Sequence, residues 1–421
     1  RSPMVHQWTL SLQHEIWNTI FEARYVGNRA ADLLRAYDYN QVNIYAGGFY
    51  EDFLRARSNG FLALNAGQGF NPAYNPSLPG SQQLTLIPTF ASGGSLTSAA
   101  VRQEIQQGEV GSLADRYQQN RAVAPGFFYP NPAALAANTI SNSGYSLYNA
   151  LQLDVRRRLR AGMQVQANYT FSKVLSNTIG NDQARFEPFL DINNPSLENA
   201  RAPFDIRHII KANYVVELPF GAGRRWSGNR FTNTVLGGWM LGGIINWQSG
   251  TPFSVFSNRG TLNRGARSTE KNTASIAGIS GSDLFDQVGG VWMTPNGPRF
   301  VNPSIIDPAG RGTSGDGQAA FNGQIFYNPD PGTVGNTQRR MFSGPWTFNW
   351  DASVLKRFHV TERQYVEFRA EAFNVLNTPQ FWVGNETSST TRFNINSTTF
   401  GVINSTLNSS RIMQFGLYYR F

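Results

Sequence analysis

Asp205 and His208 are the residues whose types and spacing come closest to proton-transfer chemistry. An aspartate near a histidine can orient the imidazole as a general base, and such a base needs a nucleophile. No serine stands in the G-x-S-x-G context that hydrolases use. The four histidines form no H-E-x-x-H motif and no clustered metal spacing; they are His6, His14, His208 and His359. We therefore expect no enzymatic activity.

Other segments with ligand-binding composition also lack the order that a site requires. The run GTSGDG at residues 312–317 is not followed by the lysine and helix of a phosphate-binding loop, so loop flexibility explains it. Asp307, Asp316 and Asp330 could offer oxygen ligands to Ca²⁺, but their spacing does not match the EF-hand series. The chain has no cysteine, which excludes thiolate metal sites and a disulfide scaffold. We expect no cofactor and no metal.

Two groups of charged residues remain. Glu367, Arg369 and Glu371 alternate along one segment, where they could contact a solute or a partner domain, or neutralise one another in a wet interior. Arginines at residues 156–160 and 224–225 could bind lipid phosphates or lie in solvated turns. The net charge of +9 is otherwise scattered and no nucleic-acid-binding motif is present. We expect no nucleic acid partner.

The elements that must position these residues are amphipathic strands. Residues 162–175, GMQVQANYTFSKVL, alternate between apolar or aromatic side chains and polar, almost uncharged ones. A period of two puts the two sets on opposite faces of a strand, whereas a helix would scatter the Gln and Asn residues around its circumference. The same alternation recurs in eight more segments, at residues 6–14, 19–27, 147–157, 207–218, 237–248, 347–358, 364–374 and 411–421.

Composition agrees with strands that cross a membrane. Mean hydropathy is -0.35, and the longest apolar run, VLGGWMLGGII at residues 235–245, is far short of the ~20 residues of a spanning helix. Aromatic residues make up 13% of the chain and charged residues only 15%, a balance typical of a membrane barrel with aromatic girdles. A soluble β-sandwich stays open on composition alone.

The connections decide between these two folds. Short turns at residues 156–162, 219–233 and 358–363 alternate with long segments rich in Asn, Gly, Ser, Thr and Pro at residues 28–144, 176–207, 257–345 and 378–410. Outer-membrane barrels show this alternation, with short periplasmic turns and long extracellular loops. We therefore predict an all-β fold: part of the wall of an antiparallel transmembrane β-barrel.

The last strand sets the direction of the others. The chain ends in RIMQFGLYYRF, with apolar residues on one face and an aromatic residue at the end. This ending resembles the assembly signal of bacterial outer-membrane proteins at Gln414, Gly416, Tyr419 and Phe421, which implies the barrel-assembly machinery as a partner. The last strand would then run toward the periplasm, with the long loops outside.

Several segments together resemble the Oar-like branch of TonB-dependent transporters. They are NYTFSKVLSN at residues 168–177, APFDIRHIIKANYVVELPFGAGRRW at 202–226, SGTPF at 249–253, FRAEAFNVLNTPQF at 368–381, and the terminal phenylalanine. The resemblance implies a Gram-negative outer-membrane receptor whose lumen holds an N-terminal plug that contacts the TonB complex. Barrels of about 22 strands have such a plugged lumen.

The chain departs from that family in extent. The start, RSPMVHQWTLSL, is no signal peptide and resembles the middle of a longer chain. We expect residues 1–421 to be the C-terminal part of the barrel domain, without the plug and the N-terminal strands. The expected function is energised transport of an unidentified bulky solute across the cell outer membrane. The alternative is a surface adhesion or scaffold barrel, or a passive pore.

Parity predicts which residues face lipid and which face the lumen, because a one-residue slip would exchange the two sets. The predicted lipid-facing residues are Tyr169, Phe171, Tyr214, Trp239, Trp247, Phe368, Tyr419 and Phe421. The predicted lumen-facing residues are Gln164, Gln166, Asn168, Lys211, Asp351, Glu367, Arg369 and Glu371. Packing of Phe368 and Tyr169 against a second sheet would instead indicate a soluble sandwich.

Overall fold

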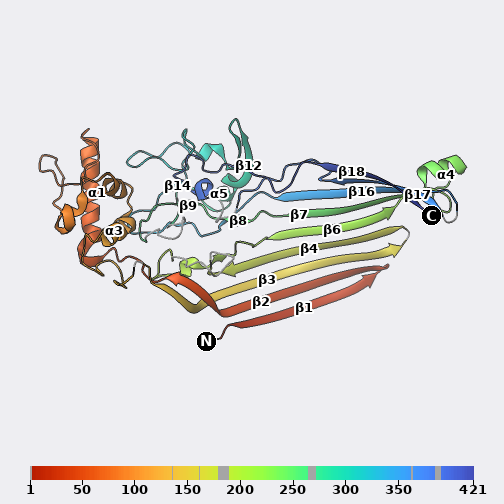
Figure 1. Cartoon of the computed structure of the whole chain (residues 1–421), viewed down its shortest axis with the longest axis horizontal. Coiled ribbons are helices and arrows are strands. Elements are labelled where there is room, and N and C mark those ends of the chain that lie inside the picture. Colours follow the sequence, from red (N-terminus) through yellow and green to blue (C-terminus); the bar gives the residue numbers. More distant parts are fainter. Residues whose placement is uncertain are drawn as a thin grey trace.

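One long antiparallel sheet dominates the computed structural model, which describes residues 2–134, 136–160, 162–178, 189–263, 272–361, 364–384 and 390–421. Its strands follow the order β1-β2-β3-β4-β6-β7-β16-β17-β18, and the short β5 pairs with β4 (Figure 1). They are β1 (Met4–Ile16), β2 (Thr19–Asp38), β3 (Asn138–Arg160), β4 (Met163–Ser176), β5 (Ala200–Arg201), β6 (His208–Glu217), β7 (Trp239–Gln248), β16 (Thr347–His359), β17 (Tyr365–Phe373) and β18 (Ile412–Arg420). The predicted all-β, antiparallel fold is confirmed.

Short turns and long loops lie at opposite ends of this sheet, as the sequence predicts (Figure 1). At the short-turn end, β1 and β2 are joined by Trp17 and Asn18, with φ of 46° and 61°. Positive φ at both central residues is typical of a type I′ hairpin, whose twist matches that of the flanking strands. The C-terminus lies at the same end, beside α4 (Arg230–Leu236) in the connection from β6 to β7.

The first long loop is shorter than predicted at both ends, because β2 and β3 stay paired as far as Asp38 and Asn138. Register shifts between Ala30 and Leu33 and between Leu33 and Arg35 interrupt the alternation of side chains. Bulges of this kind insert residues into one strand, so the period of two fails although pairing continues. The predicted loop boundary at residue 28 was wrong for this reason.

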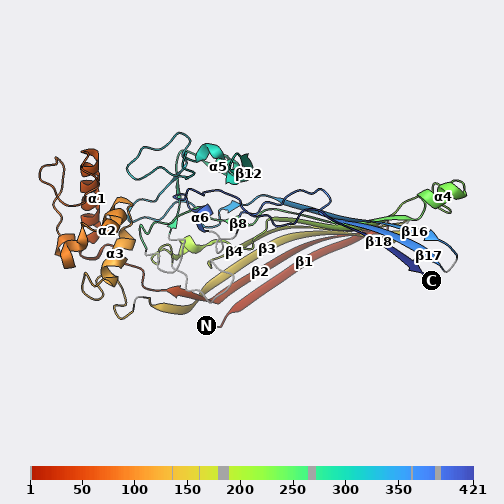
Figure 2. The same ribbon diagram turned by 45° about the horizontal axis from the view of Figure 1, so that its top comes forward.

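The rest of that loop folds into a helical unit. It contains α1 (Phe49–Asn65), α2 (Ala99–Gln106) and α3 (Val110–Gln119), which lie beyond the loop end of the sheet (Figure 2). Aromatic rings fill its interior: Phe49 is fully buried and packs against Phe90, Tyr117 and Phe128. The sequence prediction treated these residues as loop and did not foresee the helices.

A second core joins the loops that follow β7 and β17. Phe253 is fully buried and stacks on Phe342 and Phe393, at ring-centroid distances of 5.8 and 5.3 Å. The remaining short elements belong to these loops: β8 (Pro252–Phe253), β9 (Phe256–Ser257), β10 (Asn272–Thr273), β11 (Ser275–Ile276), α5 (Gly281–Gln287), β12 (Val288–Thr294), β13 (Gly297–Val301), β14 (Phe326–Tyr327), β15 (Phe342–Ser343) and α6 (Thr390–Phe393). The outer loops therefore have packed interiors of their own.

The apolar face of the large sheet is not covered by a second sheet of comparable size, since every other sheet within the described ranges has two strands. Leu12 and Leu417 remain 75% and 72% exposed there. A row of exposed leucines and aromatics contradicts the sandwich alternative, in which these side chains would be packed. No described helix has the length and apolar character needed to span a bilayer.

The base of the second core depends on a close approach of two backbone segments, and Gly250→Ala tests it. A Cβ at position 250 would lie 2.0 Å from the Gly344 carbonyl oxygen, beside the hydrogen bond from the Gly344 amide to Thr251. Overpacking of this kind costs about 1–3 kcal/mol. We expect faster hydrogen exchange over residues 250–256 and 341–344 in the full-length protein, while the exposed Ser77→Ala control stays at the wild-type rate. Equal rates in both variants would contradict the prediction.

Candidate functional site

The register brings all the predicted lumen-facing residues to one face of the sheet. In antiparallel pairs, residues directly opposite each other lie on the same face. Gln164 is opposite Val215, which is opposite Gly242, and the row continues through Ser353 to Glu371. The other six share the parity of this row: Gln166, Asn168, Lys211, Asp351, Glu367 and Arg369. The register shows that these residues lie on one face. It remains a prediction that this face lines the lumen.

Strands β2 and β3 add an ion network to this polar face that the sequence prediction did not single out. The Arg156 guanidinium donates to Glu22 at 2.8 Å and lies 2.5 Å from an Asp154 carboxylate oxygen, and Arg24 also pairs with Glu22. With Gln166 and other residues of β4, these side chains line a hollow of ≈ 340 Å³. The polar face is therefore hollowed at this point, and its predicted place on the concave side of a barrel stays a prediction.

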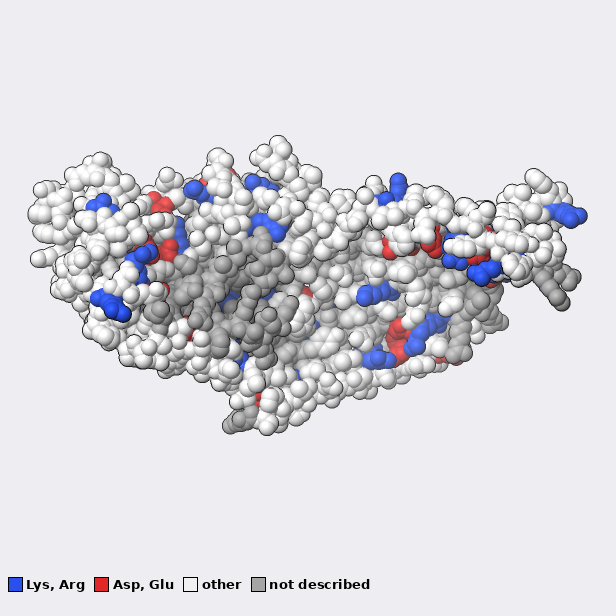
Figure 3. Space-filling view, viewed as in Figure 1, with Lys and Arg blue, Asp and Glu red and all other residues white. Residues whose placement is uncertain are grey.

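A second ion network lies on β16 and β17, near the short-turn end. Glu367 is 3% exposed and accepts hydrogen bonds from Arg357 at 2.9 Å and from Arg369 at 2.7 Å. Figure 3 looks onto this face, where basic and acidic side chains gather next to one another over the strands. The charges of the face thus neutralise one another locally, in agreement with the simpler of the two interpretations that the sequence left open.

Aromatic side chains form a group at the loop end of the opposite, apolar face. The His208 ring stacks on Trp346 at 5.5 Å and lies 5.0 Å from Phe171, and its Nδ1 is 2.9 Å from the Tyr169 hydroxyl. Asp205 is buried and instead accepts hydrogen bonds from Arg201 and from the Val174 amide, both at 2.7 Å. Asp205 and His208 therefore do not form a base and its orienter.

A second aromatic group lies at the short-turn end of the same face, where Tyr419 and Phe421 pack at 5.9 Å. Trp239 and Trp247 belong to the two groups and lie on one strand, β7, about 27 Å apart at roughly 3.4 Å per residue. Bilayer-facing bands of outer-membrane barrels are about 25 Å tall between two aromatic girdles. The remaining predicted lipid-facing residues, Tyr214 and Phe368, share the parity of this face.

Charged residues on the apolar face stay near its two ends. Arg29 and Lys173 lie at the loop end, and Arg157 and Lys356 at the short-turn end. A charge costs roughly 2–4 kcal/mol at the bilayer midplane and close to zero near the interface. This distribution is therefore what a membrane-spanning sheet requires.

Lys356 is the most unusual of these residues. Its side chain is 1% exposed, and its ammonium donates to the carbonyl oxygens of Thr234 at 2.7 Å, Val235 at 2.8 Å and Gly237. The ammonium also lies 5.1 Å from the centre of the Trp239 ring. Carbonyls at the end of a helix carry partial negative charge, so they stabilise the cation. The sequence signal was a lysine out of parity in residues 347–358, and the sequence analysis missed it.

The residues that resemble an assembly signal lie on β18, at one edge of the sheet. Gln414 is opposite Glu371, Gly416 is opposite Arg369, and both lie on the polar face. The Tyr418 ring leans over Gly416, where a Cβ would lie 2.8 Å from it. Tyr419 and Phe421 are exposed on the other face. Their predicted recognition during assembly remains a prediction.

Buried ions join the loops across the end of the sheet. Glu198 lies 3.4 Å from Arg35 of β2 and 3.7 Å from Arg339, and all three side chains are almost fully buried. Arg259 binds Asp316 and also donates to the Gln107 carbonyl of the helical unit at 3.2 Å. The segment GTSGDG, which contains Asp316, therefore takes part in contacts between the loops, and its flexibility stays a prediction. No metal-ligand cluster occurs in the parts of the chain that the structure describes.

Asp52 organises the helical unit. Burial alone would raise the pKa of its carboxyl, but hydrogen bonds from the amides of Ile87, Thr85 and Leu86 and from Arg55 outweigh burial and lower that pKa below its ordinary value of 3.8. The three amide bonds measure 2.8, 2.8 and 2.9 Å. Because they favour the ionised carboxylate, the segment holding these amides is tied to α1 more strongly while Asp52 is charged.

A meander of strands with one polar and one apolar face, girdled at both ends and carrying long loops on one side, defines the wall of an outer-membrane β-barrel protein. The chain belongs to the family described as outer membrane beta barrel domain, whose sequence profile matches residues 1–414. The protein is located in the outer membrane.

Two solved structures resemble the chain. The outer membrane transporter YddB from Escherichia coli has 10% sequence identity and a TM-score of 0.36, with 100% of this chain and 33% of that chain covered. P. aeruginosa FpvA, bound to a heterologous pyoverdine with Fe, has 7% identity and a TM-score of 0.28, with 99% and 30% covered. The chain thus spans about a third of the length of these proteins. No curated protein shows significant similarity to it.

Lys356→Met should destabilise the protein by roughly 1.5–3 kcal/mol, the contribution of one hydrogen bond to a charged group, because it removes the donor to three carbonyl oxygens. The measurement is guanidinium unfolding of the full-length protein in lipid vesicles, followed by tryptophan fluorescence. Lys211→Met, at an exposed position on the polar face, is the matched control and should change stability by less than about 0.5 kcal/mol. A loss of similar size in both variants would show that the carbonyl contacts are unimportant.

The helical unit should loosen in acid through Asp52. Since the folded-state pKa of this carboxyl is depressed, its stabilisation is present above the unfolded pKa of about 4 and is lost as pH falls through the lower folded value. Hydrogen exchange of the Thr85, Leu86 and Ile87 amides, corrected for the intrinsic effect of pH, should accelerate over that interval. Asp52→Asn should exchange faster at neutral pH and lose this acid response. An unchanged acid response in the variant would assign it to another group.

Proposed function

We propose that this chain supplies wall strands and outer loops of an energised transporter for a bulky solute. The observation that carries the proposal is the joint arrangement of a polar face with two ion-pair networks and a cap of packed loops at one end of it. A solute captured by the loops would pass along the polar face after the plug, which we place outside residues 1–421, is displaced. No catalytic step and no cofactor are part of the proposal.

The polar face suits a wet lumen. Its carboxylates Glu22 and Glu367 are paired with arginines, so a passing solute would meet amide groups and neutralised ion pairs there. Such a surface binds many polar solutes weakly, which permits passage. Lipid contact of this face would place several charges in the bilayer, at roughly 2–4 kcal/mol for each Arg or Lys at the midplane.

The loops suit capture because they are organised before any solute arrives. The core around Phe253 and Phe342 and the buried ions around Glu198 hold them in place. Pre-ordered loops lose little conformational entropy on binding. The hairpin of β12 and β13 projects from this cap and carries Met293, which is 71% exposed at its tip (Figure 1).

We further propose the partners of the complete protein. Energy would come from the TonB complex through the plug, and the C-terminal strand would contact the barrel-assembly machinery. An adhesion or scaffold barrel, or a passive pore, would use the same wall without TonB. Transport is favoured over adhesion because a paired polar face continues along the sheet below the loops, which surface binding alone does not require.

Comparison of spent growth media tests the proposal. Cells lacking the full-length protein and cells lacking TonB should both leave the same solutes in the medium, as detected by mass spectrometry, and the full-length gene should restore uptake. Solutes that disappear normally without TonB would indicate a passive pore. Loss of surface attachment with no change in the medium would indicate an adhesion barrel.

The loop cap can be tested in the same assay. Replacing residues 291–296 at the tip of the β12–β13 hairpin with a two-residue turn removes exposed side chains and leaves the core around Phe253 intact. We expect at least a several-fold fall in uptake of the identified solute with normal assembly in the membrane. Trimming residues 66–69, in an exposed turn of the helical unit, is the matched control. Unchanged uptake after hairpin trimming would remove this hairpin from the capture surface.

A further inference from the structure

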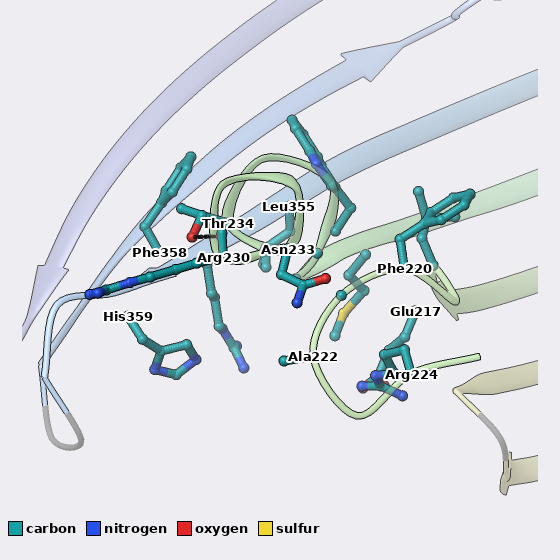
Figure 4. Close-up of a pocket in the computed structure, with 17 residues that line it drawn as sticks. Glu217, Phe220, Ala222, Arg224, Arg230, Asn233, Thr234, Leu355, Phe358 and His359 are labelled. Atoms are coloured by element: carbon teal, nitrogen blue, oxygen red, sulfur yellow. Dashed lines mark hydrogen bonds and ion pairs between the residues drawn. The ribbon is translucent and has the colours of Figure 1, made fainter. Parts of the chain in front are cut away.

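The connection between β6 and β7, residues 218–238, is the longest at the short-turn end and contains α4. None of the residues of α4 is buried. A cavity of ≈ 720 Å³ lies between this connection and the ends of β6, β7 and β16, with Glu217 and Arg224 on one side and Arg230 and His359 on the other (Figure 4). Because α4 covers no hydrophobic core, contacts with neighbouring elements must hold it in place.

The apolar face of the sheet holds α4 in position. Besides the three carbonyl contacts of Lys356, the Trp239 indole donates to the Val235 carbonyl at 3.0 Å. Trp239 and Lys356 are direct partners on the apolar face. The carboxyl end of α4 is thus fixed to the side of the wall that carries the aromatic girdle, at the level of that girdle.

The connection exposes a set of large apolar side chains. Phe231 is 77% exposed and Trp226 is 53% exposed, and Val235 and Leu236 are exposed as well. Four such residues within eleven positions are costly in water. They lie at the same end of the sheet as Leu417 and Tyr419, which are exposed on its apolar face.

Cations accompany these apolar residues. Arg225 lies over the Trp226 ring at 5.5 Å. It makes no ion pair among the described residues, while Arg224 is neutralised by Glu217. Arg230 instead lines the cavity together with Glu217 and His359 of the polar face. Apolar side chains flanked by an unpaired arginine match the boundary between acyl chains and phosphate groups, where amphipathic helices bind.

We propose that residues 225–236 form an interfacial anchor that inserts Phe231, Val235 and Leu236 among the lipids of the periplasmic leaflet and binds glycerophospholipid phosphates through Arg225. Lys356 is a positioning residue in this anchor: it holds the end of α4 against the wall. The proposal rests on the proposed orientation of the apolar face toward lipid. It goes beyond transport, because it assigns a lipid-binding role to a turn.

Spin labelling of the full-length protein, in a cysteine-free background and in vesicles of phosphatidylethanolamine and phosphatidylglycerol, tests the anchor; this chain itself has no cysteine. Nitroxides are introduced by Phe231→Cys, by Leu417→Cys on the apolar face and by Phe285→Cys, whose parent side chain is 48% exposed in the outer loops. We expect labels 231 and 417 to collide mainly with oxygen, which concentrates in lipid, and label 285 mainly with an aqueous nickel chelate.

The outcomes separate the anchor from the orientation on which it rests. Label 231 in water with label 417 in lipid overturns the anchor and leaves the orientation intact. Label 417 in water overturns both. A second measurement counts phosphatidylglycerol molecules retained by the purified protein in native mass spectrometry: Arg225→Gln should lower the number, and Arg225→Lys should preserve it. Equal retention in all variants would contradict phosphate binding.

Discussion

Backbone hydrogen bonding in a medium without water is the constraint on which the rest of this structure depends. Within a bilayer each peptide N–H and C=O must find a partner in the protein, and neighbouring strands supply those partners. The nine-strand meander meets this need over most of its area through uninterrupted antiparallel registers, such as the thirteen consecutive pairs from Met4 to Ile16. The same pairing makes parity common to all strands, so one face collects polar side chains and the other collects apolar ones.

The two faces of the sheet therefore differ in how their charged side chains are stabilised. On the polar face, carboxylates such as Glu22 and Glu367 lie next to arginines on neighbouring positions, and water can reach most of them. On the apolar face, charges occur only toward the ends within the described strands, and Lys356 requires three carbonyl oxygens of another element. The carbonyls of α4 and of Gly237 supply these oxygens, and the exposed side chains of α4 form the surface that we propose to meet lipid.

The long loops bury their apolar side chains in cores of their own, as soluble proteins do. Away from the bilayer, the apolar side chains of long loops must be buried, and here they form two clusters, one around Phe49 and one around Phe253. Glu198 pairs with Arg339 of the loop after β7 and with Arg35 of β2, and Arg259 joins the two loop units through its hydrogen bond to the Gln107 carbonyl. The loops therefore present a shaped surface above the polar face, which a flexible tether could not do.

Sequence alone determined the strands and which residues of each strand share a face, because alternation in segments such as 162–175 is a local property of a strand with one apolar face. It also determined the alternation of short and long connections and the family. Only the tertiary structure decided that Glu22 pairs with Arg156 and that Asp205 binds Arg201 and the Val174 amide instead of His208. It alone also decided the helices α1 to α3 and the burial of Lys356. These depend on residues far apart in the chain, and bulges near Leu33 erase the local period where β2 continues beyond it. Local pattern specifies which side of a strand a residue occupies, whereas register between strands specifies what it meets there.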